Sequence, residues 1–330
     1  MDFFGPIWMG RKIEPQRMNI FKKIFLILLV LTSFQGCSLR TRVIEEFAEM
    51  AEAGMGAFEA DDDLGLVEKA FPANIKLLET LLASSPKNGR ILTLLAKMYG
   101  SYSFLFFEPA LEAAKLDVDY PGPLVDSGWK NDVHHLKPVL DRYYLKGSEY
   151  ALRALEINHE KCREQLKNVA AVDAFFKSLN QEDVPALFWY GFNLGGYVNL
   201  NMDSVKALSM AFLAEKAMQR VIELDPGYYH GGAHLFLMAY YGGRSPMMGG
   251  NPDASLAHYQ EVKALTGEGF LLAELYHARY YLYQRQDKKK FIQVLSRLAE
   301  RKSREEPLAL LNRVAANRAS TYLKALDHFF

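Results

Sequence analysis

The sequence has only two cysteines, Cys37 and Cys162, and no excess of charge of either sign. Two cysteines exclude a scaffold of several disulfides and any cysteine-rich zinc or iron–sulfur site. The 39 basic and 39 acidic side chains cancel, so nothing suggests the basic face that nucleic-acid binding requires. No Gly-x-Ser-x-Gly, Ser-x-x-Lys or paired-carboxylate motif occurs in a recognisable context. Nucleic-acid binding and catalysis are therefore disfavoured.

The chain nonetheless has the material for a large core. It contains 330 residues, of which 50% are hydrophobic and 13% are aromatic. This composition with balanced charge is typical of a folded globular chain and not of a disordered one. The length allows one large domain, two ordinary domains or an array of repeats.

Residues 1–36 are predicted to be a signal peptide. Lys22 and Lys23 precede a short apolar run at residues 24–31. Because a membrane-spanning helix needs about 20 apolar residues, this run fits a signal sequence better than a transmembrane helix. Met18 would give a signal peptide of ordinary length, so we expect residues 1–17 to come from an upstream start.

The signal ends at Gly36-Cys37, which resembles the cleavage site of a bacterial lipoprotein. The resemblance implies that Cys37 is lipidated, becomes the mature N-terminus and anchors the protein to a bacterial membrane. The alternative is a plain secretory signal in which Cys37 has no special role. With Cys37 lipidated, Cys162 would have no disulfide partner, and we expect it to be a small buried hydrophobic residue.

Residues 37–330 are predicted to form a single compact all-α domain. Leu213, Ala217 and Val221 recur every four residues, with charged side chains between them, which predicts an amphipathic helix. No sustained alternation of period two is bounded by hairpin turns, so we expect no sheet. Further helices are predicted at residues 66–84, 90–102, 136–157, 162–179, 185–200, 229–241, 252–265, 271–284, 289–301 and 307–326.

The joints between these helices resemble those of tetratricopeptide repeats. Residues 221–226, Val-Ile-Glu-Leu-Asp-Pro, end one helix, and a helix rich in Gly and Ala follows. His159 and Pro226 are separated by about twice the 34-residue period of that repeat. We therefore predict a degenerate α-solenoid with a loop at residues 117–132, where Pro121 and Pro123 prevent a helix. An ordinary helical bundle is the alternative.

The most unusual predicted helix, residues 185–200, combines aromatic side chains with Gly191, Gly195 and Gly196. Each glycine inside a helix costs about 1 kcal/mol relative to alanine, so a close neighbour must offset the loss. One interpretation is a small-molecule cavity with aromatic walls and the amides of Asn193 and Asn199. The other is tight helix–helix packing, for which the glycines make room.

A second segment, residues 228–252, is rich in glycine and also contains two histidines. His230 and His234 are four residues apart and would share a helical face, a spacing that some metal sites use. No His-Glu-x-x-His motif or third ligand accompanies them, so we expect no metal and favour a hydrogen-bonded pair that lines a helix groove. Arg244 could bind a carboxylate, although solvation at the surface is the simpler interpretation.

Together the two segments supply the predicted ligand-binding residues. These are Trp189, Phe192, Asn193, Gly195, Gly196, Tyr197, Asn199, His230, His234, Tyr240 and Arg244.

The signal, the helical repeats and the two glycine–aromatic segments together resemble the TatT family, the T component associated with tripartite ATP-independent periplasmic (TRAP) transporters. The resemblance covers roughly residues 37–300. Its most specific parts are residues 189–196, 234–242, 246–250, 254–260 and 278–281.

The resemblance implies a periplasmic, lipid-anchored, tetratricopeptide-like scaffold that engages the substrate-binding protein of a TRAP transporter. It also implies a hydrophobic pore that could pass a small organic ligand to that partner. We expect no cofactor and no nucleic acid, and a homo-oligomer is compatible with the sequence. Competing hypotheses are an envelope scaffold without a cavity and an enzyme that uses His230 or His234.

Overall fold

The computed structural model describes residues 42–123, 132–301 and 307–330. The predicted signal peptide and Cys37 lie outside the described residues. The chain divides into two units, residues 1–47 and 48–330. In the first unit the described residues, 42–47, are helical, and the helix runs on to residue 59. This helix was not predicted. All features below belong to the second unit.

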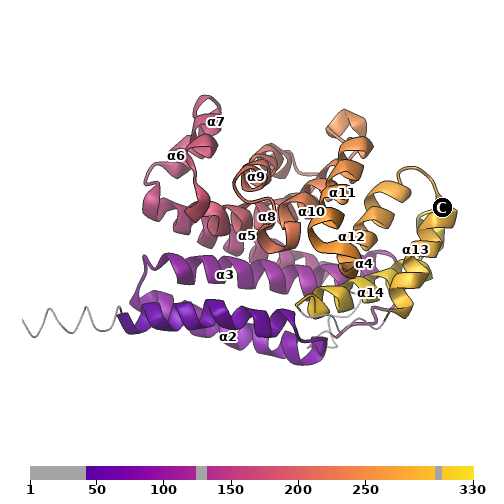
Figure 1. Ribbon diagram of the computed structural model, residues 1–330, viewed down its shortest axis with the longest axis horizontal. Coiled ribbons are helices and arrows are strands. Elements are labelled where there is room, and N and C mark those ends of the chain that lie inside the picture. Colours follow the sequence, from indigo (N-terminus) through magenta and orange to yellow (C-terminus); the bar gives the residue numbers. More distant parts are fainter. Residues whose placement is uncertain (1–41, 124–131, 302–306) are drawn as a thin grey trace, which may run out of the picture. The chain divides into compact units, whose positions relative to one another are not determined.

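The described ranges contain helices and no strand, so the predicted all-α fold class is confirmed (Figure 1). The larger elements are α2 (Leu64–Ser84), α3 (Gly89–Tyr102), η1 (Ser103–Phe107), α4 (Glu108–Lys115), α5 (Val133–Asn158), α6 (Cys162–Lys167), α7 (Val169–Ser178), α8 (Val184–Leu200), α9 (Val205–Leu224), α10 (Tyr228–Gly242), α11 (Pro252–Thr266), α12 (Leu271–Tyr276), η6 (His277–Leu282), α13 (Lys288–Glu300) and α14 (Ala309–Lys324).

The helices pack mainly in pairs of neighbours, as in a tetratricopeptide-like array. The most extensive pairings are α3 with α5, α5 with α8, α8 with α9, and α10 with α11. Helix α8 therefore lies between α5 and α9 and also contacts α3 and α10. This central position explains why α8 is hydrophobic on nearly all sides, as expected for a buried helix.

Side-chain caps fix where several helices begin. Asp63, Asn88, Ser204 and Asn251 each accept a hydrogen bond from a backbone N–H in the first turn of α2, α3, α9 and α11. Such caps satisfy donors that have no partner within the helix, and each contributes about 1 kcal/mol. In α11 the cap Asn251 is followed by Pro252 as the first helical residue.

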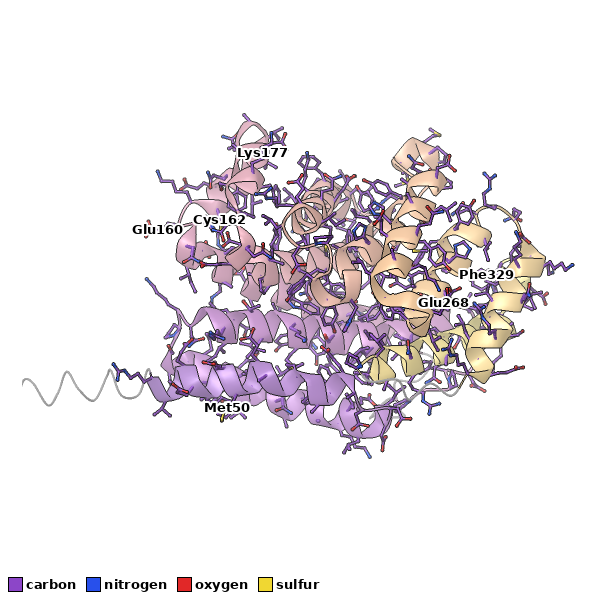
Figure 2. The ribbon with its side chains drawn as sticks, in the orientation of Figure 1. Met50, Glu160, Cys162, Lys177, Glu268 and Phe329 are labelled. Carbon is purple, nitrogen blue, oxygen red and sulfur yellow. The ribbon has the colours of Figure 1, made fainter. Side chains whose placement is uncertain are left out.

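Local corrections concern helix continuity. The single helix predicted at residues 162–179 is two helices, because Asn168 takes an extended backbone and its side chain caps Ala170 at the start of α7. Cys162, at the start of α6, is buried, as predicted, and is a free thiol within the described residues (Figure 2). Burial raises the pKa of its thiol to about 11, which keeps it protonated and unreactive.

Another correction concerns residues 103–115, which were not predicted to be helical. Here the chain continues from α3 through the π-helix η1 into α4. The helix predicted at residues 271–284 likewise changes from α12 into a second π-helix, η6. Of the predicted loop at residues 117–132, the described part up to Pro123 is non-helical, and residues 124–131 lie outside the described residues.

Candidate functional site

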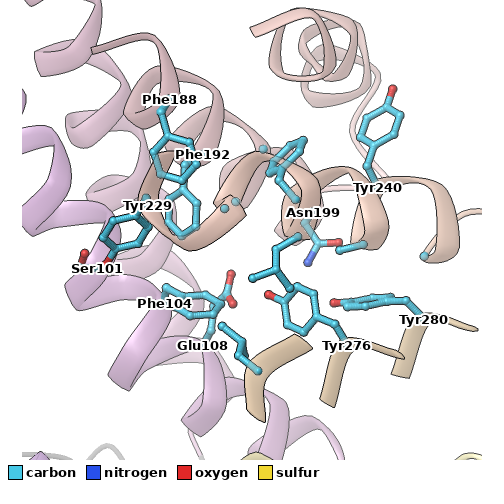
Figure 3. A pocket seen from close by; sticks show the side chains of 18 of the residues that line it. Ser101, Phe104, Glu108, Phe188, Phe192, Asn199, Tyr229, Tyr240, Tyr276 and Tyr280 are labelled. Carbon is cyan, nitrogen blue, oxygen red and sulfur yellow. The ribbon is translucent and has the colours of Figure 1, made fainter. Parts of the chain in front are cut away.

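A partly open cavity of about 160 Å³ lies among the helices of the second unit (Figure 3). Its walls come from α3, η1, α4, α5, α8, α10, α12, η6 and α14. An apolar cavity of about 150 Å³ accepts one benzene molecule, so this space suits a guest the size of a single ring. The residues that enclose it lie far apart in the sequence, from Ser101 to Leu311.

Aromatic rings form a large part of the cavity wall. Trp189 of α8 is fully buried and makes edge-to-face contacts with Phe188, Phe192 and Tyr229, with ring centroids 5.0, 5.2 and 5.0 Å away. Such contacts fix the orientation of the rings beyond what burial alone would do. The aromatic residues of the lining are Phe104, Tyr144, Phe188, Trp189, Phe192, Tyr229, Phe236, Tyr240, Phe270, Tyr276 and Tyr280.

Both π-helices border this cavity. Phe104 and Leu105 of η1 line it together with Glu108, the first residue of α4. On another wall, Tyr276 ends α12 and Tyr280 lies within η6. A π-turn inserts an extra residue and changes which side chains face a neighbour, and such turns are frequent at functional sites.

The glycines of α8 make room for rings that neighbouring helices contribute to this wall. A Cβ at Gly195 would overlap the ring of Phe236 from α10, and a Cβ at Gly196 would come within 2.6 Å of the Tyr144 ring from α5. Gly191 faces α9, where its Cβ would meet Ala217 at 3.0 Å. Neighbouring side chains thus fill the space beside the glycine backbone. The rings that fit beside Gly195 and Gly196, those of Phe236 and Tyr144, in turn form part of the cavity wall.

The cavity also contains a carboxyl group, that of Glu108. Tyr144 donates a hydrogen bond from its hydroxyl to Glu108 Oε1 at 2.7 Å. Burial raises the pKa of Glu108 to about 7, the charge of Glu112 adds to the rise, and Arg318 acts against it. Figure 3 shows the carboxyl group of Glu108 and the hydroxyl groups of Tyr276 and Tyr280 turned toward the cavity.

Arg244 and Tyr240 form a second polar part of the lining. The guanidinium group of Arg244 lies 3.5 Å from the centre of the Tyr240 ring, and Nη1 donates to the Tyr240 carbonyl at 2.9 Å. Partial burial lowers the pKa of Arg244, although the group stays charged. The stacking and the hydrogen bond hold this arginine in place, and no carboxylate of the described residues forms an ion pair with it.

Seven of the predicted ligand-binding residues come together on the cavity wall: Trp189, Phe192, Gly195, Gly196, Asn199, Tyr240 and Arg244. Asn193, Tyr197, His230 and His234 are not part of the lining.

Asn193 connects helices within the core. It is fully buried, and Nδ2 donates to the carbonyl oxygens of Ala96 on α3 and Trp189 on its own helix, at 3.0 and 2.7 Å. Gly100 and Gly147 provide the space for its amide, because a Cβ at either position would overlap it. The geometry of Asn193 is that of a packing residue between α3, α5 and α8.

The expectation that His230 and His234 share one helical face is wrong. Tyr229, His230 and Gly231 have φ angles of 48, 59 and 70°, so a left-handed turn interrupts the start of α10. His230 lies 3.8 Å from Glu59, whereas His234 pairs with His258 of α11, with 2.9 Å between the Nδ1 atoms. Within the described ranges no group of three or more His, Cys, Asp or Glu residues is placed to hold a metal ion.

Sequence reasoning missed several residues of the wall, above all Phe104, Glu108 and Tyr144. The run Phe104-Leu-Phe-Phe107 is an aromatic signal, but it lies in the segment that was not predicted to be helical. Tyr144 lies in an ordinary amphipathic helix, and nothing in its local pattern distinguishes it from a core tyrosine. These residues become recognisable only when the helices are assembled.

Comparison with known protein families identifies the family of this chain. No curated protein matches the chain. In the described part of the chain, no helix combines the length and the apolar character needed to cross a bilayer. The family model described as TAtT, TRAP transporter T-component, matches residues 60–330 and so includes every residue of the cavity wall. Since the match covers most of the chain, the protein belongs to the TRAP transporter T-component family.

Proposed function

We propose that this protein is a non-enzymatic accessory component of a TRAP system that holds a small, largely apolar organic ligand in the aromatic cavity. It would engage the periplasmic substrate-binding protein of the system and exchange the ligand with it. Membership of the family supports association with TRAP components. The predicted lipid anchor at Cys37 would keep the protein at the periplasmic face of a membrane.

The cavity is the observation that carries the ligand proposal. Binding sites for small molecules are concave, mostly apolar and furnished with a few polar groups, and this cavity has all three properties. Edge-to-face contacts hold some of its rings, and others pack closely against the glycines of α8. The cavity is therefore largely preformed. A preformed site avoids much of the entropy loss of ordering on binding.

A scaffold without a ligand is the alternative, and the glycines favour it in one respect. Gly191, Gly195 and Gly196 are explained by contacts with Ala217, Phe236 and Tyr144, without any guest. On this alternative the cavity would be a packing defect, and partner binding would not depend on it.

Filling the cavity distinguishes the two functions. Ala239 of α10 lines the cavity, so Ala239→Leu should reduce binding of a ring-sized probe, benzyl alcohol, by about tenfold or more. The matched control is Ala264→Leu on the exposed face of α11, which should bind as the unmodified protein does. Calorimetric titration measures the affinity, and thermal unfolding checks that both variants fold. Equal binding by the two variants would reject the ligand proposal, as would failure of the unmodified protein to bind benzyl alcohol and its charged analogues benzylammonium and benzoate.

A further inference from the structure

Two charged side chains, Glu108 and Arg244, belong to the cavity lining, and they differ in the contacts that they already make. Arg244 is stacked on Tyr240 and bonded to its carbonyl group. Glu108 accepts one hydrogen bond, from Tyr144 to Oε1, and within the described residues Oε2 accepts none. No cationic group of the described residues lies within ion-pair distance of Glu108. Its carboxylate is therefore available to form an ion pair with a bound cation.

The surroundings of Glu108 are aromatic. Phe104 lies one helical turn earlier, and Tyr276 lies near the Glu108 carboxyl group (Figure 3). Tyr144 is hydrogen-bonded to the same carboxyl group. The face of an aromatic ring attracts a cation, by about 0.5–1 kcal/mol when exposed and 2 or more when desolvated. The guanidinium group of Arg318 already lies over the Phe104 ring, 5.6 Å from its centre, so the rings of this wall do hold a cation. A carboxylate with aromatic rings beside it favours an organic ammonium group over an anion.

The basic group behind this wall, Arg318 of α14, is already paired. Its Nη2 donates to Glu112 Oε1 at 2.7 Å, and the side chain is only 2% exposed. Nε and Nη1 of Arg318 have no hydrogen-bond partner in the described part of the chain, but Arg318 is not among the residues that line the cavity.

We propose that the guest of this cavity is an organic cation, an amine or quaternary ammonium compound with an apolar ring or chain, whose nitrogen pairs with Glu108. The inference rests on the proposed ligand-binding function and specifies its substrate class. The ammonium group would lie beside the Glu108 carboxylate and the ring faces, and the apolar part would occupy the remainder of the aromatic space.

Protonation of Glu108 makes the proposed binding depend on pH. The groups that influence Glu108 are Glu112 and Lys115 on its own helix, Tyr144 of α5, Tyr276 of α12, Tyr280 of η6 and Arg318 of α14. With a pKa of about 7, the empty site is partly protonated at neutral pH, whereas pairing with a cation needs the ionised form. Affinity should therefore rise between pH 6 and pH 8, and binding should release a proton.

Three probes that share one ring test the charge preference: benzylammonium, benzyl alcohol and benzoate. Titrated calorimetrically into the full-length protein at pH 8, benzylammonium should bind about tenfold tighter than benzyl alcohol, and benzoate most weakly. E108Q should reduce the ratio of benzylammonium to benzyl alcohol affinity to about one. E164Q, at an exposed position of α6, is the matched control and should keep the ratio of the unmodified protein.

The outcomes separate this inference from the proposed function. Equal affinities for benzylammonium and benzyl alcohol would overturn the cation preference while leaving the ligand cavity intact, and tightest binding of benzoate would assign an anionic guest instead. Absence of binding by all three probes would overturn both proposals. Should E108Q fail to fold, the unmodified protein still provides the test, because a benzylammonium affinity that does not increase from pH 6 to pH 8 contradicts the pairing with Glu108.

Discussion

Helices α8 and α10 have similar compositions, rich in glycine and aromatic residues, yet they take different local structures. Helix α8 has no interruption, whereas α10 begins with three left-handed residues. The two helices also exchange side chains: Gly195 of α8 admits the ring of Phe236, and Gly232 of α10 admits the ring of Phe188. In each helix, then, a glycine makes room for an aromatic ring of the other helix. The left-handed turn in α10 in addition places Tyr229 in the cavity wall.

The reciprocal rings should contribute unequally to stability. Phe188 is 1% exposed, whereas Phe236 is partly exposed where it borders the cavity. Phe188→Ala should therefore lower the free energy of unfolding by about 3–5 kcal/mol, and Phe236→Ala should lower it by less. Urea denaturation of the two variants measures the difference. Equal losses would contradict the distinction between a fully buried ring and a partly exposed one.

The glycines that admit these rings provide a smaller test. Alanine normally stabilises a helix relative to glycine, but at Gly195 and Gly232 its Cβ would clash with Phe236 and Phe188. Each substitution by alanine should destabilise the protein by about 1–3 kcal/mol. Gly54→Ala is the control, because no atom lies within 4 Å of the added Cβ, and it should be neutral or stabilising. Melting temperatures that rise in all three variants would show that the rings move aside freely.

Substitution by glycine should stabilise the left-handed turn of α10, whereas it destabilises a regular helix. His230 has a φ of 59°, and this conformation costs a non-glycine residue roughly 1–2 kcal/mol. His230→Gly should therefore raise the free energy of unfolding by up to about 1 kcal/mol, after the loss of its contact with Glu59. Gln260→Gly, at an exposed position within α11, should lower it by about 1 kcal/mol. The same sign for both variants in chemical denaturation would contradict the strained turn.

Much of the fold could be predicted from local pattern. The apolar spacing in α9 and the capping residues Ser204 and Asn251 determine helix positions through interactions within a few residues. The same local reasoning failed at Asn168, whose side chain ends one helix and caps the next. It also failed at residues 103–115, where an aromatic run enters a π-turn that tertiary packing stabilises.

The candidate site was predictable only in part. The glycine–aromatic pattern of α8 led to Trp189, Phe192 and Asn199, which line the cavity, but also to Asn193, which packs between helices. The sequence of a single helix does not show which of its faces borders a cavity and which packs against a neighbouring helix. The position of Glu108 depends on η1, and no pattern in the sequence marks that change of register.

The sequence by itself determined the helical class, the family and the glycine–aromatic segments, because these follow from periodicity, capping and short motifs. Only the tertiary structure decided that Phe236 and Tyr144 occupy the space above Gly195 and Gly196, that His234 pairs with His258 and not with His230, and that Glu108 lies among aromatic rings. The physical reason is that contacts between distant helices select one face of each, and a cavity exists only where those chosen faces fail to fill the space between them.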